Sequence, residues 1–235
     1  MSLLSIQNIN TGYDKKQVLF DISLEVEKGE TILLIGANGS GKSTLLKAIY
    51  GILPLWKDEK GRGKIIYEGE DITNISSHEL IKKGLMYIPQ KNELFEDMTV
   101  EENLKMSTLF LNNSAETKKR LEYVFEKIHI LEIKQKQIVN RLSGGERKKL
   151  SLGMILMNRP KLLLYDEPLA GLSGKNIKET IDQLTLIKEA GTTLIIVEHR
   201  IKELISFADM VIGLKLGYLQ KEDLTDLENI KMFLV

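Results

Sequence analysis

Short apolar runs with polar turns between them occupy both ends of the chain. The early runs are rich in β-branched residues and predict strands; they cover residues 3–9, 18–26, 31–36, 63–72 and 85–90. Two later runs, 161–168 and 192–199, are continuously apolar, as expected of strands buried on both faces of a parallel sheet. A further strand is expected over 210–217. The pattern predicts an α/β fold.

Helical periodicity fills several of the intervals between these strands. Residues 42–52 ("KSTLLKAIYGI") space their apolar positions as a helix does. The same spacing runs over 99–133, where Thr99 and Ser114 are suited to cap helix starts. Residues 176–191 lie between the two continuously apolar strands and complete a strand–helix–strand unit.

The order of these elements suggests how the domain is built. We predict one domain spanning 1–235, in which a nucleotide-binding α/β core of residues 1–90 and 161–235 is interrupted by helices over 91–160. The polar stretch 57–63 ("KDEKGRG") is expected to be a solvated loop.

Composition narrows the classes of partner. The 235 residues contain 33 Lys and Arg against 33 Asp and Glu, so no net field favours nucleic acid or an anionic membrane. The absence of cysteine excludes disulfides and thiolate metal sites. No apolar run approaches the roughly 20 residues that span a bilayer, and the start lacks a secretory signal. We expect a cytoplasmic chain without direct membrane insertion, whose membrane role, if any, depends on a partner.

A glycine-rich loop joins the predicted strand 31–36 to the following helix. Its sequence, "GANGSGKST", matches G-x-x-x-x-G-K-[ST] after a strand and before a helix, as that motif requires. Glycines let successive N–H groups turn toward one point, and the helix N-terminus adds its positive end, so the loop favours phosphate. Lys42 is expected to reach the β- and γ-phosphates, and Ser43 to ligate Mg²⁺. The expected nucleotide-binding residues here are Gly36, Asn38, Gly39, Ser40, Gly41, Lys42, Ser43 and Thr44.

Two adjacent acids end the apolar run "LLLYDEP". An acid at the carboxyl end of a buried parallel strand points into the crevice where α/β proteins bind ligands. Asp166 is expected to hold Mg²⁺ opposite Ser43, and Glu167 to act as general base or to orient the attacking water. Packing does not explain two such carboxylates, because isolated buried charge is costly. The sequence therefore predicts a site for a nucleoside triphosphate with Mg²⁺.

The stretch "LSGGERKKL" (142–150) places a serine and two glycines before the charged start of a predicted helix. With the phosphate loop and the tandem acids, "LSGGE" just upstream of "LLLYDEP" resembles the signature of ABC transporter ATP-binding subunits. The resemblance extends from Leu4 to about Leu219. It implies a P-loop NTPase core with a mainly parallel sheet, an antiparallel β subdomain near the N-terminus and an inserted helical subdomain carrying the signature.

The resemblance also implies partners. In that family two subunits pair head to tail, and the signature of one faces the γ-phosphate of ATP held by the other. Ser143, Gly144 and Gly145 would accordingly bind ATP on a second copy or a close paralogue, although Ser143 equally suits a plain helix cap. Integral membrane subunits are the other implied partners, and would hold the chain at the cytoplasmic face of the membrane.

Three more residues match family positions. Tyr13, in "TGYDKKQVL", resembles the aromatic residue that stacks on adenine, and is otherwise a strand-end tyrosine. Gln90, in "YIPQ", resembles the glutamine that joins Mg²⁺ and the attacking water to the membrane subunit, and is otherwise a loop residue. His199, in "IIVEHR", resembles the switch histidine that contacts the γ-phosphate and steadies Glu167.

The branch of the family can be inferred only from short sequence segments, and these leave alternatives open. "EDIT", "ELFEDMTVEENL" and "DEPLAGL" most resemble ATPases of branched-chain amino acid importers, and ATPases of lipopolysaccharide export share much of this wording. Two further alternatives are a soluble ABC ATPase of iron–sulfur assembly or ribosome work and an inactive nucleotide-binding scaffold. The scaffold is disfavoured by the intact set of Lys42, Asp166, Glu167 and His199. In the loop after the tandem acids, Ser173 stands where the family often has an aspartate. This difference weakens the case for communication between the two ATP sites through that loop.

Overall fold

The computed structural model describes residues 2–58, 61–91, 94–172 and 174–220. The chain divides into two compact units, one made by residues 1–90 and 161–235 and the other by residues 91–160. Ser173 lies outside the described residues, so the prediction about its loop stays a prediction. No helix in the described ranges is long and apolar enough to cross a membrane.

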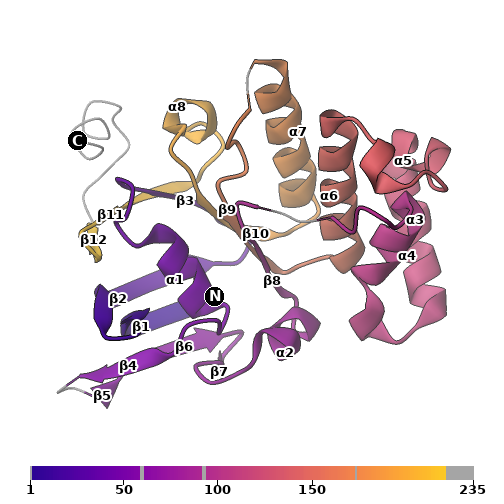
Figure 1. Ribbon diagram of the computed structural model, residues 1–235. Coiled ribbons are helices and arrows are strands. Elements are labelled where there is room, and N and C mark those ends of the chain that lie inside the picture. The colour runs from indigo at the N-terminus through magenta and orange to yellow at the C-terminus, as the bar shows by residue number, and fades with distance from the viewer. Residues whose placement is uncertain (1, 59–60, 92–93, 173, 221–235) are drawn as a thin grey trace. The chain divides into compact units, whose positions relative to one another are not determined.

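A mainly parallel sheet forms the centre of the first unit, in the order β12-β11-β3-β10-β9-β8 (Figure 1). Only β12 is antiparallel to its neighbour. The strands are β3 (Thr31–Ile35), β8 (Leu85–Ile88), β9 (Leu162–Asp166), β10 (Thr193–Val197), β11 (Met210–Lys215) and β12 (Tyr218–Gln220). Every residue of β3 and β10 is buried, which explains their continuously apolar sequences. The predicted parallel sheet is confirmed.

The first unit contains the two predicted helices, α1 (Lys42–Ile49) and α7 (Lys175–Glu189), and two short ones that were not predicted, α2 (Ser77–Lys82) and α8 (Ile201–Leu204). Helix α7 joins β9 to β10, which pair in parallel, and so completes the strand–helix–strand unit. The carboxyl ends of β3, β9 and β10 therefore lie together at one edge of the sheet, each followed by a loop.

An antiparallel sheet is the second sheet of the first unit. Its strands are β1 (Ser2–Tyr13), β2 (Lys16–Glu27), β4 (Leu55–Asp58), β5 (Gly61–Arg62), β6 (Lys64–Tyr67) and β7 (Glu70–Asp71). The predicted loop over 57–63 is wrong, because β4 and β5 pair there as a hairpin. Leu55 and Trp56 of β4 pair with β1, and β4 continues from them into the polar stretch. Strand β5 then lies at the edge of the sheet.

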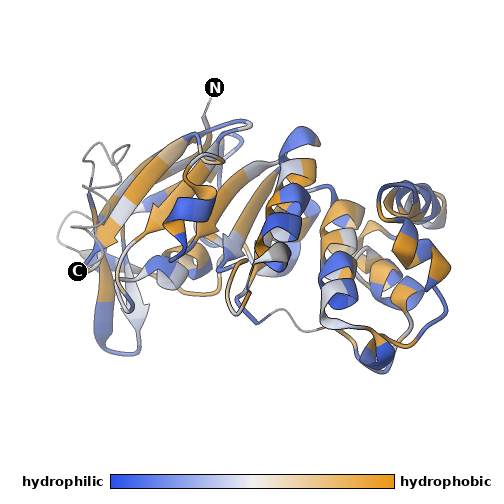
Figure 2. Ribbon diagram, turned by 90° about the horizontal axis from the view of Figure 1, so that it is seen from above, coloured by the Kyte–Doolittle hydropathy of each residue, from blue (hydrophilic) through white to orange (hydrophobic). Residues whose placement is uncertain are grey.

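The hydrophobic core of this unit lies between the two sheets, with α1 contributing to it (Figure 2 shows how the apolar residues gather on the strands). Leu45 and Leu46 of α1 are fully buried together with Ile6 of β1 and Leu164 of β9. Because α1 is fixed by apolar side chains on both sides, the loop that precedes it is anchored at the start of a rigid element.

The second unit is helical. It contains α3 (Val100–Met106), η1 (Leu109–Leu111), α4 (Ser114–Lys127), α5 (His129–Ile133), η2 (Val139–Arg141) and α6 (Gly144–Asn158). Thr99 caps α3 as predicted, in a reciprocal capping box with Glu102. The prediction of Ser114 as a cap is wrong by one residue: the Asn113 side chain accepts the Glu116 N–H, and Ser114 is the first helical residue.

Candidate nucleotide site

The phosphate loop lies between β3 and α1, and its glycines have positive φ angles that other residues rarely adopt. Gly41 precedes α1 with φ 110°, and an added Cβ there would lie 2.6 Å from the side chain of Leu19. At Gly36 an added Cβ would lie 2.2 Å from the Leu214 carbonyl oxygen. The Ser40 hydroxyl is buried and has no hydrogen-bond partner within the described part of the chain. An unsatisfied buried hydroxyl beside a concave main chain fits a phosphate ligand.

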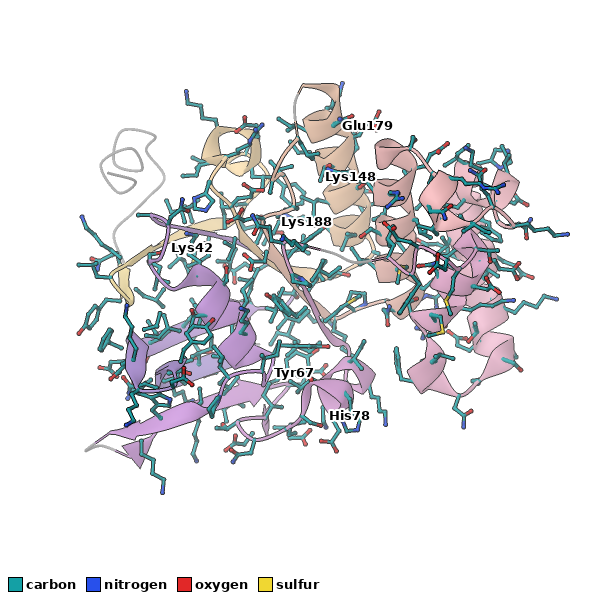
Figure 3. The ribbon with its side chains drawn as sticks, viewed as in Figure 1. Lys42, Tyr67, His78, Lys148, Glu179 and Lys188 are labelled. Atoms are coloured by element: carbon teal, nitrogen blue, oxygen red, sulfur yellow. The ribbon has the colours of Figure 1, made fainter. Side chains whose placement is uncertain are left out.

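Lys42, the first residue of α1, is buried with its ammonium folded back on the loop (Figure 3). Its Nζ donates to the carbonyl oxygens of Gly36 at 2.9 Å and Ala37 at 3.0 Å. Burial lowers the pKa of Lys42, and the nearby charges of Glu167 and Asp166 oppose that shift. A positive charge is thus held at the helix N-terminus, where a triphosphate needs it.

The turn between β11 and β12 braces the same loop from outside the motif. The Gly217 N–H donates to the Ser40 carbonyl at 3.0 Å, and the Gly217 carbonyl accepts the Phe20 N–H at 2.9 Å. Gly217 has φ 83°, and an added Cβ would lie 2.0 Å from the Val18 carbonyl oxygen. This support was not predicted, since only the close approach of three segments reveals it.

Asp166 and Ser43 meet as predicted. Asp166 ends β9 and is buried, and its Oδ1 accepts a hydrogen bond from the Ser43 hydroxyl at 3.1 Å. Burial raises the pKa of Asp166, and the bond from Ser43 partly offsets this shift. Tyr87 adds a hydroxyl 3.4 Å from the other carboxylate oxygen, a neighbour that was not predicted.

This pair has the chemistry of a magnesium site. No group of three His, Cys, Asp or Glu side chains in the described ranges is placed to hold a metal ion alone. Mg²⁺ typically takes one or two carboxylates together with a hydroxyl, waters and the substrate phosphates, all of them oxygen ligands. Asp166 and Ser43 supply a carboxylate and a hydroxyl, so the residues present fit Mg²⁺ bound with a nucleotide.

Glu167 directly follows β9 and contacts residues at or just after the ends of two other strands, β8 and β10. Its φ of 50° lies in the left-handed region, and its N–H donates to the Val197 carbonyl at 2.9 Å. One carboxylate oxygen lies 3.0 Å from Nε2 of His199, and the other accepts from Gln90 Nε2 at 2.5 Å. An uncommon backbone conformation in a non-glycine residue is often found at functional sites. The structure therefore brings together Glu167, His199 and Gln90 as the sequence suggested.

Tyr13 lies beside α1 at the end of β1. The residue is 42% exposed, and Lys47 Nζ lies 5.7 Å from the centroid of its ring. Its hydroxyl is 3.5 Å from both Thr44 Oγ1 and Lys47 Nζ. A partly exposed aromatic ring next to the phosphate loop has the chemistry to stack on a base.

The signature residues belong to the second unit. Ser143 is the N-cap of α6: its hydroxyl accepts the Glu146 N–H at 3.4 Å, and its own N–H donates to Glu146 Oε2 at 2.9 Å. Lys134 Nζ lies 2.6 Å from the other oxygen of Glu146. Hence Ser143 is a cap, and Gly144 and Gly145 begin a helix of 15 residues whose first N–H groups lack helical acceptors.

Comparison with known proteins decides the family. The family model described as "ABC transporter" matches residues 19–170, more than half of the chain. The chain belongs to the ABC transporter ATP-binding family. Subunits of this family are ATPases that bind ATP with Mg²⁺ and work as dimers with the integral membrane subunits of a transporter.

Several relatives of this ABC ATPase match along nearly their whole length. The high-affinity branched-chain amino acid transport ATP-binding protein BraG of Pseudomonas aeruginosa is 35% identical over 221 residues, covering 94% of this chain and 92% of BraG. The lipopolysaccharide export system ATP-binding protein LptB of Escherichia coli K12 is 31% identical over 225 residues, covering 93% and 89%. The crystal structure of the ADP conformation of MJ1267, an ATP-binding cassette of an ABC transporter, has a TM-score of 0.84 at 29% identity and covers 99% of both chains.

Proposed function

We propose that this ATPase subunit hydrolyses ATP through Glu167, with His199 and Gln90 holding that carboxylate in place. The observation that supports this best is the pair of bonds to the two oxygens of Glu167. A carboxylate held from both sides keeps one orientation, and geometry is the first requirement of a general base. Lys42 binds the β- and γ-phosphates and neutralises charge that develops on them. Tyr13 stacks on the adenine, and the phosphate loop donates its N–H groups to the triphosphate.

Mg²⁺ would be held by Ser43, Asp166 and, with nucleotide bound, Gln90. The ion supplies charge compensation on the phosphates and so makes them easier to attack. The chain itself places the Glu167 carboxylate, the proposed proton acceptor, next to Asp166. It also keeps the Lys42 ammonium buried beside the phosphate loop. Proton acceptance by Glu167 and phosphate binding by Lys42 are therefore separable tasks.

In this proposal, each ATP-binding site is completed by the signature residues of a second subunit. Ser143, Gly144 and Gly145 open α6, and an anion at that helix start would receive N–H groups and the positive end of the helix. The second subunit is an identical chain or a close paralogue. The dimer lies on the cytoplasmic side of the membrane, attached through the membrane subunits.

Steady-state hydrolysis with the membrane subunits present tests the catalytic assignment. Replacing Glu167 with Gln removes the proton acceptor and should lower kcat by about 10²–10⁴-fold while MgATP still binds. The matched control is Glu189→Gln, which removes an exposed carboxylate at the end of α7. Turnover retained in Glu167→Gln, or lost equally in both variants, contradicts the assignment.

The transported substrate we propose is a branched-chain amino acid. The similarity to BraG over 94% of this chain supports it, together with the wording of the segments quoted above. The similarity to LptB supports a second candidate, a lipopolysaccharide exporter. Co-purification of the membrane subunits, followed by ATP-dependent leucine uptake in proteoliposomes, separates the two. Uptake that is absent while lipopolysaccharide stimulates the ATPase would favour the exporter, and recovery of soluble iron–sulfur scaffold proteins alone would contradict both.

A further inference from the structure

Glu198 is a buried acid that the catalytic proposal does not use. It directly follows β10, next to His199, and is 2% exposed. Its side chain accepts three main-chain hydrogen bonds. Oε1 accepts the Leu169 N–H at 2.5 Å, and Oε2 accepts the N–H groups of His199 at 2.9 Å and Arg200 at 3.2 Å.

These bonds join the two loops that carry the catalytic pair. Leu169 lies two residues after Glu167, on the loop that leaves β9, whereas His199 lies on the loop that leaves β10. The strands are already paired up to Asp166 and Val197, and the Glu167 N–H bonds to the Val197 carbonyl. Beyond that point the sheet ends, and the Glu198 carboxylate provides the next connection between the loops.

A carboxylate suits this position better than other side chains. An ionised carboxyl group only accepts hydrogen bonds, and does so through both oxygens, whereas a carboxamide has one accepting oxygen and a nitrogen that donates. An amide here would turn its NH₂ toward at least one N–H group and leave that donor unsatisfied in a buried place. The structure also pairs Glu198 with no Lys, Arg or His side chain in the described ranges, so main-chain N–H groups compensate its charge.

We propose that Glu198 is a positioning residue for ATP hydrolysis. By binding both loops it fixes the His199 imidazole and the Glu167 carboxylate at their 3.0 Å separation. Glu198 touches neither nucleotide nor water in this proposal and acts through Glu167. The inference rests on the proposed catalytic role of Glu167.

The test compares Glu198→Gln and Glu198→Asp in the assembled transporter, with Glu203→Gln on α8 as the control for loss of one negative charge. We expect Glu198→Gln to lower kcat by about tenfold or more, because small displacements of catalytic groups have effects of this size. The Kd for MgATP should stay within twofold, since Lys42 and the phosphate loop are unchanged. Glu198→Asp keeps both oxygens on a shorter side chain and should retain more activity than the Gln variant.

The same substitution in a Glu167→Gln background separates positioning from a general loss of stability. If Glu198 acts through Glu167, it should change the residual turnover there by less than twofold, whereas misfolding would lower turnover in either background. An equal fold-loss in both backgrounds overturns the proposal, as does unchanged kcat in Glu198→Gln. If Glu198→Gln does not fold, the Asp variant decides by the same comparison. Wild-type turnover in Glu167→Gln itself would instead refute the proposed function.

Discussion

The imidazole of His199 and the carboxylate of Glu167 face one another with Nε2 of the histidine 3.0 Å from Oε1 of the glutamate. The two residues come from neighbouring parallel strands, because Asp166 and Val197 are register partners at the carboxyl ends of β9 and β10. Parallel pairing thus delivers an acid and a histidine, 32 residues apart in sequence, to one point.

Replacing His199 with Ala should lower kcat for ATP hydrolysis by about 10²-fold, because Glu167 loses one of its two side-chain bonds. ATP binding should change little, since Lys42 and the phosphate loop are intact. His129→Ala, at an exposed position in the second unit, is the matched control. A variant that binds ATP normally and turns over at the wild-type rate would show that the contact has no catalytic role.

Replacing Lys42 with Ala should act on binding instead. The charge-assisted bonds of a buried ammonium to phosphate are worth about 1.5–3 kcal/mol, so the Kd for ATP should rise by roughly tenfold to a hundredfold. Isothermal titration calorimetry measures this, with Lys82→Ala at the exposed end of α2 as the control. Unchanged affinity in Lys42→Ala would contradict phosphate binding by this side chain.

Gly217→Ala should destabilise the chain and weaken ATP binding together. Its Cβ would lie 2.0 Å from the Val18 carbonyl, so the turn that holds the Ser40 carbonyl must move. Gly191→Ala is a matched control, because Gly191 has φ 86° and nothing within 4 Å of an added Cβ. We expect about 1 kcal/mol of destabilisation for Gly191→Ala from backbone strain alone and clearly more for Gly217→Ala in urea unfolding. Equal losses of unfolding free energy in the two variants would contradict the inference that the Val18 carbonyl lies too close to position 217 for a side chain.

The capping box of α6 should make stability depend on pH. The hydrogen bond from Lys134, and then that from the Ser143 N–H, hold the pKa of Glu146 below its ordinary value. A lowered folded-state pKa means that the carboxylate stabilises the folded chain above the unfolded value of about 4.3, and that this contribution is lost as pH falls through the folded pKa. Wild type should therefore exceed Glu146→Gln in unfolding free energy at pH 7, and the difference should vanish in acid. A difference that grows on acidification would contradict this.

The parts of the site that local sequence specifies were predictable, and those that depend on long-range approach were not. The phosphate loop and the tandem acids carry their chemistry in consecutive residues, so Lys42, Ser43 and Asp166 could be named and lie together in the structure. Gly217 and Glu198 act on segments far away in sequence, and nothing beside them signals those contacts. The strand pair within 57–63 was missed because its polar composition favoured a loop: Lys57 and Asp58 pair with Arg62 and Gly61, next to the two residues of β4 that pair with β1.

The most direct test of the composite ATP site is the size of Glu167→Gln with MgATP, measured by size-exclusion chromatography with light scattering. Without its proton acceptor the variant should trap ATP between two copies and elute as a stable dimer, and it should be a monomer with ADP. Adding Ser143→Arg, which places a bulky charged side chain at the start of α6, should abolish the dimer without changing ATP binding by each copy. A Glu167→Gln protein that carries bound ATP and remains strictly monomeric would contradict the account.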